Sequence, residues 1–117
     1  MPKQETEFWD PFAVDRGSWT PIEGVAGLSE LVLTRDEDTG SYTRLLKFEP
    51  GADTRLQGVQ KHDFYEEVLI YKGAIHDVTL GQTFSAGQYA YRLPGMVHGP
   101  WVAPEGCITF EIRTFER

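Results

Sequence analysis

The sequence contains one cysteine, no long apolar run and no helical periodicity, and each shortage excludes a class of protein. Cys107 is the single cysteine, so the chain cannot form an internal disulfide, and a reducing compartment suits it. No stretch approaches the ~18 consecutive apolar residues of a membrane-spanning helix. Residues 1–12 lack an apolar run behind a basic start. We therefore expect no secretory signal and a cytoplasmic location.

Positive charge is also scarce, with 11 Lys and Arg against 18 Asp and Glu, which gives a net charge of −7. Such a chain repels nucleic-acid phosphates, so we expect no nucleic-acid partner and no membrane partner. A length of 117 residues is typical of one domain. The 40% hydrophobic and 25% charged residues are ordinary for a globular protein.

Short alternating stretches recur at intervals of about 8–12 residues, which is typical of an all-β sandwich or barrel. Residues 29–36 and 42–49 predict two strands of a hairpin, joined by a polar turn that contains Gly40. Residues 66–71 predict a strand that turns at Lys72-Gly73, and a further short strand follows. Period-two alternation places three of its side chains on one face: Glu66, Val68 and Ile70.

The remaining segments predict an irregular arm followed by one domain. Residues 1–20 carry aromatic side chains without alternation, so we expect an irregular N-terminal arm whose aromatic rings dock on the barrel or on a second subunit. Residues 21–117 predict a single compact β-barrel. Cys107 opens an apolar strand, which favours a buried thiol over a nucleophile.

Two of the three histidines lie beside turns at strand ends, in the stretches 60–73 and 87–98. Gln60 and His62 are two residues apart, so on one strand they share a face. After a tight connection, Glu66 enters the neighbouring strand almost opposite His62, and His98 arrives from a distant part of the chain. Two imidazoles and one carboxylate on one side of an ion are the facial arrangement that Fe(II) oxygenases use, and Mn, Ni, Co or Zn can also occupy it.

Two residues near this constellation have alternative interpretations. The amide oxygen of Gln60 supplies a fourth, weak ligand, or it stays behind the ligands and holds a water or a substrate oxygen. His76 is one residue out of phase with Ile75, which favours the outer face and a satisfied polar residue over a ligand.

At these residues the sequence resembles the cupin superfamily. His62, Glu66 and Gly73 match the second histidine, the glutamate and the closing glycine of the first cupin motif. The second motif is matched by Gly87, Gly95 and His98. The sequence departs from the pattern where Gln60 stands in place of the first histidine, and at Leu93 and Val102. One imidazole fewer lowers the donor strength of the site.

Three stretches, SWTPIEGV, FEPGADT and EGCITFE, look like the subgroup that includes anti-sigma-factor-type cupin domains and acetylacetone-cleaving dioxygenases. The resemblance covers roughly residues 18–115. It implies an all-β fold of the cupin type, a double-stranded β-helix or jelly-roll barrel. It also implies a divalent metal near one mouth, with Fe(II) as first choice, and a homodimer.

An apolar pocket with a few convergent polar groups is the usual form of a small-molecule site. Around the metal ligands Gln60, His62, Glu66 and His98, we expect the walls to be formed by Phe48, Val68, Ile70, Tyr89, Tyr91, Trp101, Phe110 and Ile112. The alternative for the aromatic residues is ordinary core. The expected catalytic groups are Glu66, Tyr89 and Tyr91, because a tyrosine hydroxyl that reaches the cavity can bind substrate or pass a proton.

Three functions compete on these residues. The first is a non-haem metal dioxygenase acting on a small diketone, enol or phenolic ketone. The second is a non-redox isomerase, lyase or cyclase that uses the metal as a Lewis acid and needs a base nearby. The third is a ligand-sensing module without catalysis that reports to a separate partner protein.

Overall fold

The computed structural model describes residues 2–13 and 18–115, with Gln60 described by its backbone alone. These ranges confirm the all-β prediction. No helix in them is long and apolar enough to cross a membrane. The elements in chain order are β1 (Thr20–Pro21), β2 (Leu28–Arg35), β3 (Tyr42–Phe48), β4 (Ala52–Asp53), the 3-10 turn η1 (Arg55–Gln57), β5 (Gln60–Lys61), β6 (Tyr65–Asp77), β7 (Gln82–Ser85), β8 (Tyr89–Arg92), β9 (Val97–His98), β10 (Trp101–Ala103) and β11 (Cys107–Thr114).

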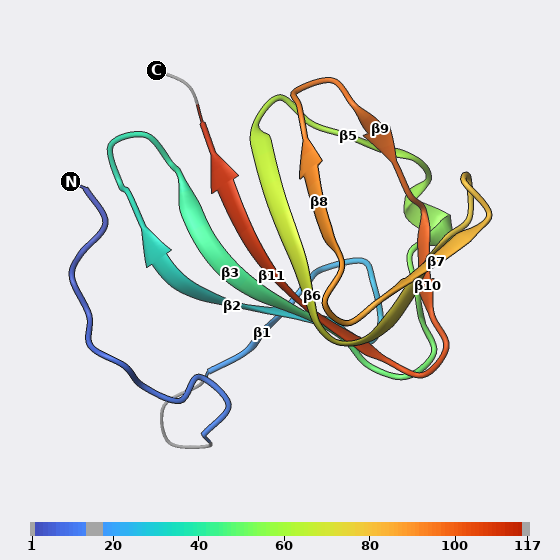
Figure 1. The fold of residues 1–117 in the computed structure, drawn as a ribbon, viewed down its shortest axis with the longest axis horizontal. Coiled ribbons are helices and arrows are strands. Elements are labelled where there is room, and N and C mark those ends of the chain that lie inside the picture. Colours follow the sequence, from blue (N-terminus) through green and yellow to red (C-terminus); the bar gives the residue numbers. More distant parts are fainter. Residues whose placement is uncertain (1, 14–17, 116–117) are drawn as a thin grey trace.

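Strand β6 is the centre of one curled sheet in which neighbouring strands run antiparallel. The main path is β1-β2-β3-β11-β6-β10-β4, and β7 and β8 also pair with β6. The first half of β6 lies between β11 and β8, and its second half lies between β10 and β7. Figure 1 shows the sheet curling from β2 and β3 toward β7 and β10, with the small β5–β9 pair above its open side.

A bulge makes β6 one bent strand, which corrects the predicted turn at Lys72-Gly73. Ile108 and Thr109 are consecutive on β11, but they pair with Lys72 and Ile70 of β6. Tyr71 is therefore an extra residue on β6. The buried face of β6 changes phase there, from Glu66, Val68 and Ile70 to Ile75 and Asp77. The predicted common face of Glu66, Val68 and Ile70 is confirmed.

The core lies inside the curl at the end opposite the β5–β9 pair. Its buried members come from β2, β3, β4, β6, β10 and β11: Leu28, Leu46, Phe48, Ala52, Ile70, Ile75, Ala103 and Cys107. The predicted buried thiol is confirmed, because Cys107 is 3% exposed and burial raises its pKa to about 11. The predicted 29–36 and 42–49 hairpin is the β2–β3 pair, with Gly40 in its turn at φ +83°.

The described residues of the N-terminal arm contact side chains of β3 and β6. Lys3 Nζ donates to Thr43 Oγ1 at 2.9 Å. Phe12 stacks on Tyr71 with ring centroids 5.5 Å apart, and Lys47 lies 4.4 Å from the Trp19 ring. Aromatic residues of the arm therefore dock on the sheet, whereas Phe8 is fully exposed.

The bend of β6 requires glycine at position 73. Gly73 has φ +80°, and a Cβ atom there would overlap the carbonyl oxygen of Gly106. Gly51 has a similar φ of +90°, and no atom lies within 4 Å of its Cβ position. A substitution at Gly51 therefore tests the backbone strain without the steric clash.

We predict that Gly51→Ala lowers the free energy of unfolding by about 1–2 kcal/mol, the penalty of a left-handed L-residue. Gly73→Ala should lower it by roughly 3 kcal/mol or more, because steric overlap with backbone is added to that strain. Urea unfolding of both variants measures the difference. Equal losses would show that the approach of Gly106 does not constrain the bend.

Candidate metal centre

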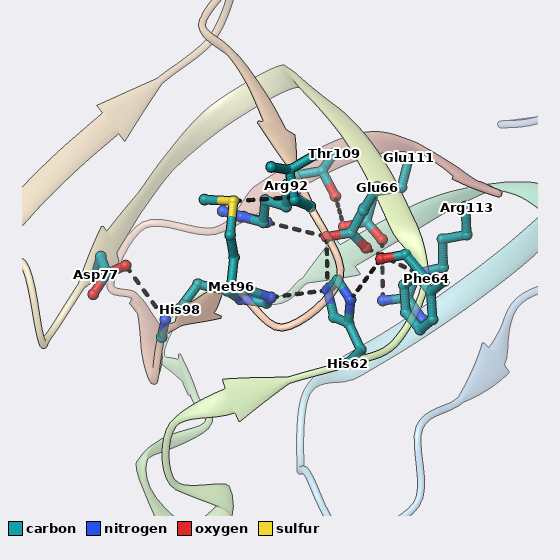
Figure 2. A network of polar contacts seen from close by, with 12 residues as sticks. His62, Phe64, Glu66, Asp77, Arg92, Met96, His98, Thr109, Glu111 and Arg113 are labelled. Carbon is teal, nitrogen blue, oxygen red and sulfur yellow. Dashed lines mark hydrogen bonds and ion pairs between the residues drawn. The ribbon is translucent and has the colours of Figure 1, made fainter. Parts of the chain in front are cut away.

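Three of the predicted ligands converge at the polar end of the curl. His62, Glu66 and His98 each offer an atom within 4.8 Å of the others. His62 precedes β6, Glu66 is the second residue of β6, and His98 ends β9. Gly95 N donates to the His62 carbonyl at 2.8 Å, which ties the loop before β6 to the turn before β9. Figure 2 shows the three side chains pointing toward one another.

Gln60 lies beside this cluster through its backbone. It pairs directly with His98 across the β5–β9 ladder. Its side chain lies outside the described part of the structure, so its predicted role as a ligand stays a prediction. His76 is outside the cluster, and its Nδ1 lies 3.0 Å from Thr83 Oγ1, as expected for a satisfied polar residue.

The hydrogen bond of His62 fixes its tautomer. Its Nδ1 lies 3.1 Å from the Phe64 carbonyl oxygen, and its ring stacks on Phe64 at 3.9 Å. A carbonyl oxygen only accepts, so Nδ1 carries the proton and the neutral ring keeps its lone pair on Nε2. That Nε2 lies 3.0 Å from His98 Nε2 and 3.7 Å from Glu66 Oε1.

His98 is held in its neutral form. Burial, with Arg92 and His62 nearby, lowers its pKa to about 4. Without a metal, His98 Nε2 donates its proton to the His62 lone pair. Its Nδ1 is buried and has no hydrogen-bond partner among the described residues. The two rings thus face each other through their Nε2 atoms, and both atoms could serve as ligands if a cation replaced the shared proton.

The carboxylate of Glu66 is buried between two arginines. Its side chain is 2% exposed, with Oε1 3.1 Å from Arg92 Nη1 and Oε2 2.8 Å from Arg113 Nε. Register explains the contact, because Glu66 pairs directly with Arg113 on β11 and with Arg92 on β8. Residues opposite each other in a ladder share a face. Neither arginine was predicted from the sequence to be part of the site. Arg113 nevertheless shares a face of β11 with the polar residues Thr109 and Glu111.

A second buried ion pair continues this polar layer. Arg44 Nε lies 2.8 Å from Glu111, and Arg44 Nη1 lies 2.9 Å from Glu30. Burial alone would raise the pKa of Glu111, but Arg44 and Arg113 outweigh it and hold that pKa below its ordinary range. Burial alone would lower the pKa of Arg44, but the attraction of Glu111 outweighs burial and raises that pKa. Both groups therefore stay charged.

The cluster closes one end of a cavity of about 450 Å³. Its walls are mainly apolar, and six of the eight predicted pocket residues line it: Phe48, Val68, Ile70, Tyr89, Tyr91 and Trp101. Phe110 and Ile112 do not, which corrects their prediction. Alternation on β11 turns the intervening Thr109 and Glu111 inward, so the two apolar side chains face outward.

Tyr89 and Tyr91 border the cavity, but their side chains lie on the outer face of β8. They pair with Leu69 and Glu67 of β6, which are exposed, whereas Arg92 pairs with buried Glu66. Tyr89 is 60% and Tyr91 is 50% exposed, and the Tyr89 hydroxyl donates to Glu67 at 2.7 Å. The expectation that a tyrosine hydroxyl reaches into the cavity is not met for Tyr89.

The donor set fits a divalent metal. Two nitrogens each ~2.1 Å from one ion and at right angles to each other lie about 3.0 Å apart, which is the separation of the two Nε2 atoms. His62 Nε2 offers a lone pair in its present tautomer, His98 Nε2 offers one once the proton that it shares with His62 is lost, and Glu66 adds a charged oxygen. Glu66 Oε1 is already paired with Arg92, so this oxygen is a weaker donor to a metal.

The chain matches a family model and several solved structures. A model described as ChrR cupin-like domain matches residues 12–114. No curated protein matches the chain. An RmlC-like cupin from Shewanella frigidimarina superposes with a TM-score of 0.72 at 21% identity, over 100% of this chain and 96% of that one.

Two further structures have more specific descriptions. An acetylacetone dioxygenase from Acinetobacter johnsonii gives a TM-score of 0.73 at 18% identity, over 96% of this chain and 76% of that one. The anti-sigma ChrR of Rhodobacter sphaeroides, solved in complex with SigE, gives 0.64 at 23% identity, over 86% of this chain. The match spans 50% of that protein's length. These similarities confirm the predicted cupin-type fold.

We predict that His62→Ala and His98→Ala each strongly reduce bound metal, and that Gln60→Ala reduces it less. Imidazole binds first-row divalent ions better than a neutral amide does. The measurement is elemental analysis of protein purified without a metal-affinity tag, with circular dichroism as the control for folding. Equal metal retention in all three variants would contradict this order of donors.

We also predict that Arg92→Gln raises the affinity for Zn(II) by roughly tenfold, because the substitution removes a competing cation from Glu66 Oε1. Arg55→Gln is the matched control, since Arg55 pairs with Asp53 and lies in η1 away from the cluster. Calorimetric titration of the metal-stripped proteins compares them. An unchanged or lower affinity in Arg92→Gln would show that Arg92 does not compete for this carboxylate.

Proposed function

The chain belongs to the ChrR cupin-like domain family, and on that premise we propose that it is a metal-dependent enzyme of the dioxygenase type. The substrate in this proposal is a small oxygenated molecule, such as a diketone, an enol or a phenolic ketone. The observation that carries the proposal is the convergence of His62, Glu66 and His98 at the polar end of a mainly apolar cavity.

The residues have distinct roles in this proposal. His62 and His98 hold the ion, with Fe(II) preferred and Mn, Ni, Co or Zn able to occupy the same donors. A bound ferrous ion would supply the redox chemistry with dioxygen that side chains of this chain lack. Glu66 would add one carboxylate oxygen to the ion while its carboxylate stays paired with Arg92 and Arg113. Two imidazoles and one carboxylate leave coordination positions for the oxygens of a substrate.

The cavity supports a substrate with an apolar body. Leu46, Phe48, Val68 and Ile70 form one side of it, and they exclude water from the side of the cluster that faces the core. A small molecule with oxygen atoms at one end would place that end at the cluster and its carbon skeleton against these side chains.

A ligand-sensing role is the second candidate, and the pairing of Glu66 favours it. A carboxylate that two arginines already neutralise is a weaker metal ligand than one held by neutral hydrogen-bond donors. In this alternative the cavity binds a ligand without turnover and a separate protein responds. The similarity to the anti-sigma ChrR is consistent with such a role.

A Lewis-acid isomerase, lyase or cyclase has less support, because it needs a base within reach of the substrate. The tyrosines expected to serve lie on the outer face of β8, and Tyr89 is engaged by Glu67. Glu66 would have to leave both arginines before it could accept a proton.

We predict that the Fe(II)-loaded protein consumes a β-diketone, with acetylacetone as the first probe, and that removal of dioxygen abolishes turnover. Loss of diketone absorbance and oxygen uptake should then occur in equal amounts, and Zn(II)-loaded protein should be inactive. His98→Ala is the control for adventitious iron.

The outcomes separate the three candidates. Turnover that persists without dioxygen, or that Zn(II) supports equally, would contradict the oxygenase and favour Lewis-acid chemistry. Absence of turnover over a panel of diketones, enols and phenolic ketones, in protein shown to hold iron, would favour the sensing role.

A further inference from the structure

Six charged side chains of alternating sign line up along the inner face of the sheet. We call them the charge row, and in order they are Glu30, Arg44, Glu111, Arg113, Glu66 and Arg92. Neighbours in the row are joined by ion pairs of 2.8–3.7 Å. The row crosses five strands, from β2 through β3, β11 and β6 to β8. Figure 2 shows its last four members around the candidate metal centre.

The charges in the row cancel. Three arginines face three glutamates, which gives a net charge of zero. The nearby acid Asp77 is 1% exposed and accepts hydrogen bonds from the backbone N–H groups of Leu80 and Gly99. Both of its carboxyl oxygens therefore have backbone donors, and no ion pair joins it to an arginine of the row among the described residues.

Arg92 differs from the other two arginines because it ends the row. Arg44 bonds Glu111 and Glu30, and Arg113 bonds Glu66 and the Tyr42 hydroxyl. Arg92 makes one side-chain hydrogen bond among the described residues, from Nη1 to Glu66. A guanidinium carries five N–H donors, so most of those on Arg92 have no acceptor in this part of the chain.

The position of Arg92 presents those donors to a ligand. Its side chain is 15% exposed and lines the cavity. The guanidinium lies 5.0 Å from the centre of the Trp101 ring, a cation–π contact that holds its plane in place. Arg92 is therefore a fixed, desolvated cation with spare donors at the boundary between the polar cluster and the apolar wall.

We propose that Arg92 anchors a planar oxyanion of the ligand, a carboxylate or an enolate, whose apolar remainder lies against the wall of the cavity. A planar guanidinium matches the two oxygens of such a group in a forked pair. A neutral carbonyl ligand would also offer acceptors to Arg92, but its hydrogen bonds would lack the opposite charge that makes a guanidinium–oxyanion pair stronger. This inference rests on the proposed function in one respect: it takes the cavity to be the site where the substrate binds.

The test compares benzoate with benzamide, which have the same shape and differ in charge. Both are titrated into the full chain, first as purified and then in EDTA, so that the second titration contains no metal contribution. The expected dissociation constant for benzoate is at least tenfold lower than that for benzamide in both conditions, by the strength of a charge-assisted hydrogen-bond pair. Equal affinities in EDTA, or no binding of either probe, would overturn the proposal.

Three variants assign the preference to Arg92. Arg92→Gln should reduce the ratio between the two probes to about twofold or less, mainly by weakening the binding of benzoate. Arg92→Lys keeps the charge without the fork and should give an intermediate ratio. Arg55→Gln, which removes a positive charge of the surface, should keep the wild-type ratio. A wild-type ratio in Arg92→Gln would overturn the assignment.

A spectroscopic measurement on the wild type covers the case in which Arg92→Gln does not fold. Benzoate should move the Arg92 Nε–H resonance in a 1H–15N spectrum further downfield than benzamide does; equal shifts with both probes at saturation, or an unmoved resonance at saturating benzoate, would also overturn the proposal. All these measurements are independent of turnover. If the oxygenase assay fails but benzoate binds as expected, the proposed enzymatic activity is contradicted and the anion site is supported.

Discussion

The carboxylate of Glu66 meets two guanidinium groups and one imidazole while its side chain is 2% exposed, and the polar end of the cavity depends on this contact. A buried charge is tolerated only when it is paired and hydrogen-bonded. Here the three strands β11, β6 and β8 each contribute one member of the set in direct register. Loss of the carboxylate would leave two guanidinium groups without the anion that they share, and β8 would be joined to this end of β6 without that side-chain contact.

This same pairing would limit metal binding at the candidate centre. An ion held by His62 and His98 has to share Glu66 Oε1 with Arg92. The centre therefore combines well-prepared imidazoles with a carboxylate that is already neutralised. A donor set of this kind binds a cation less tightly than three imidazoles and an unshared acid would. The family membership alone does not reveal this, because the arginines lie outside the motif residues.

The sequence predicted much of this architecture, since alternation and turn residues are local signals. It identified the β2–β3 hairpin, the common face of Glu66, Val68 and Ile70, and the approach of His62, Glu66 and His98. Alternation does not say which of two faces is inward, however. On β8 and β11 the apolar residues were expected inside, but the interior of this protein contains ion pairs, so Arg92, Glu111 and Arg113 turn inward instead.

The partners of those charges could not be found from one strand at a time. Arg92 and Arg113 are 26 and 47 residues from Glu66 in the chain, and their contact follows from strand register, which depends on the whole sheet. The bend of β6 was missed for a related reason. A lysine-glycine pair is typical of a turn, and only the pairing with β11 shows that the strand continues through it.

The bulge at Tyr71 has a consequence for how relatives of this chain should be aligned. Before it, even-numbered positions of β6 face the cavity; after it, odd-numbered positions do, ending at Asp77. An alignment that slides the strand by one residue without a compensating gap would exchange the buried Asp77 with the more exposed His76. It would then assign to the cavity an imidazole that does not line it, and add a histidine ligand that this arrangement does not provide.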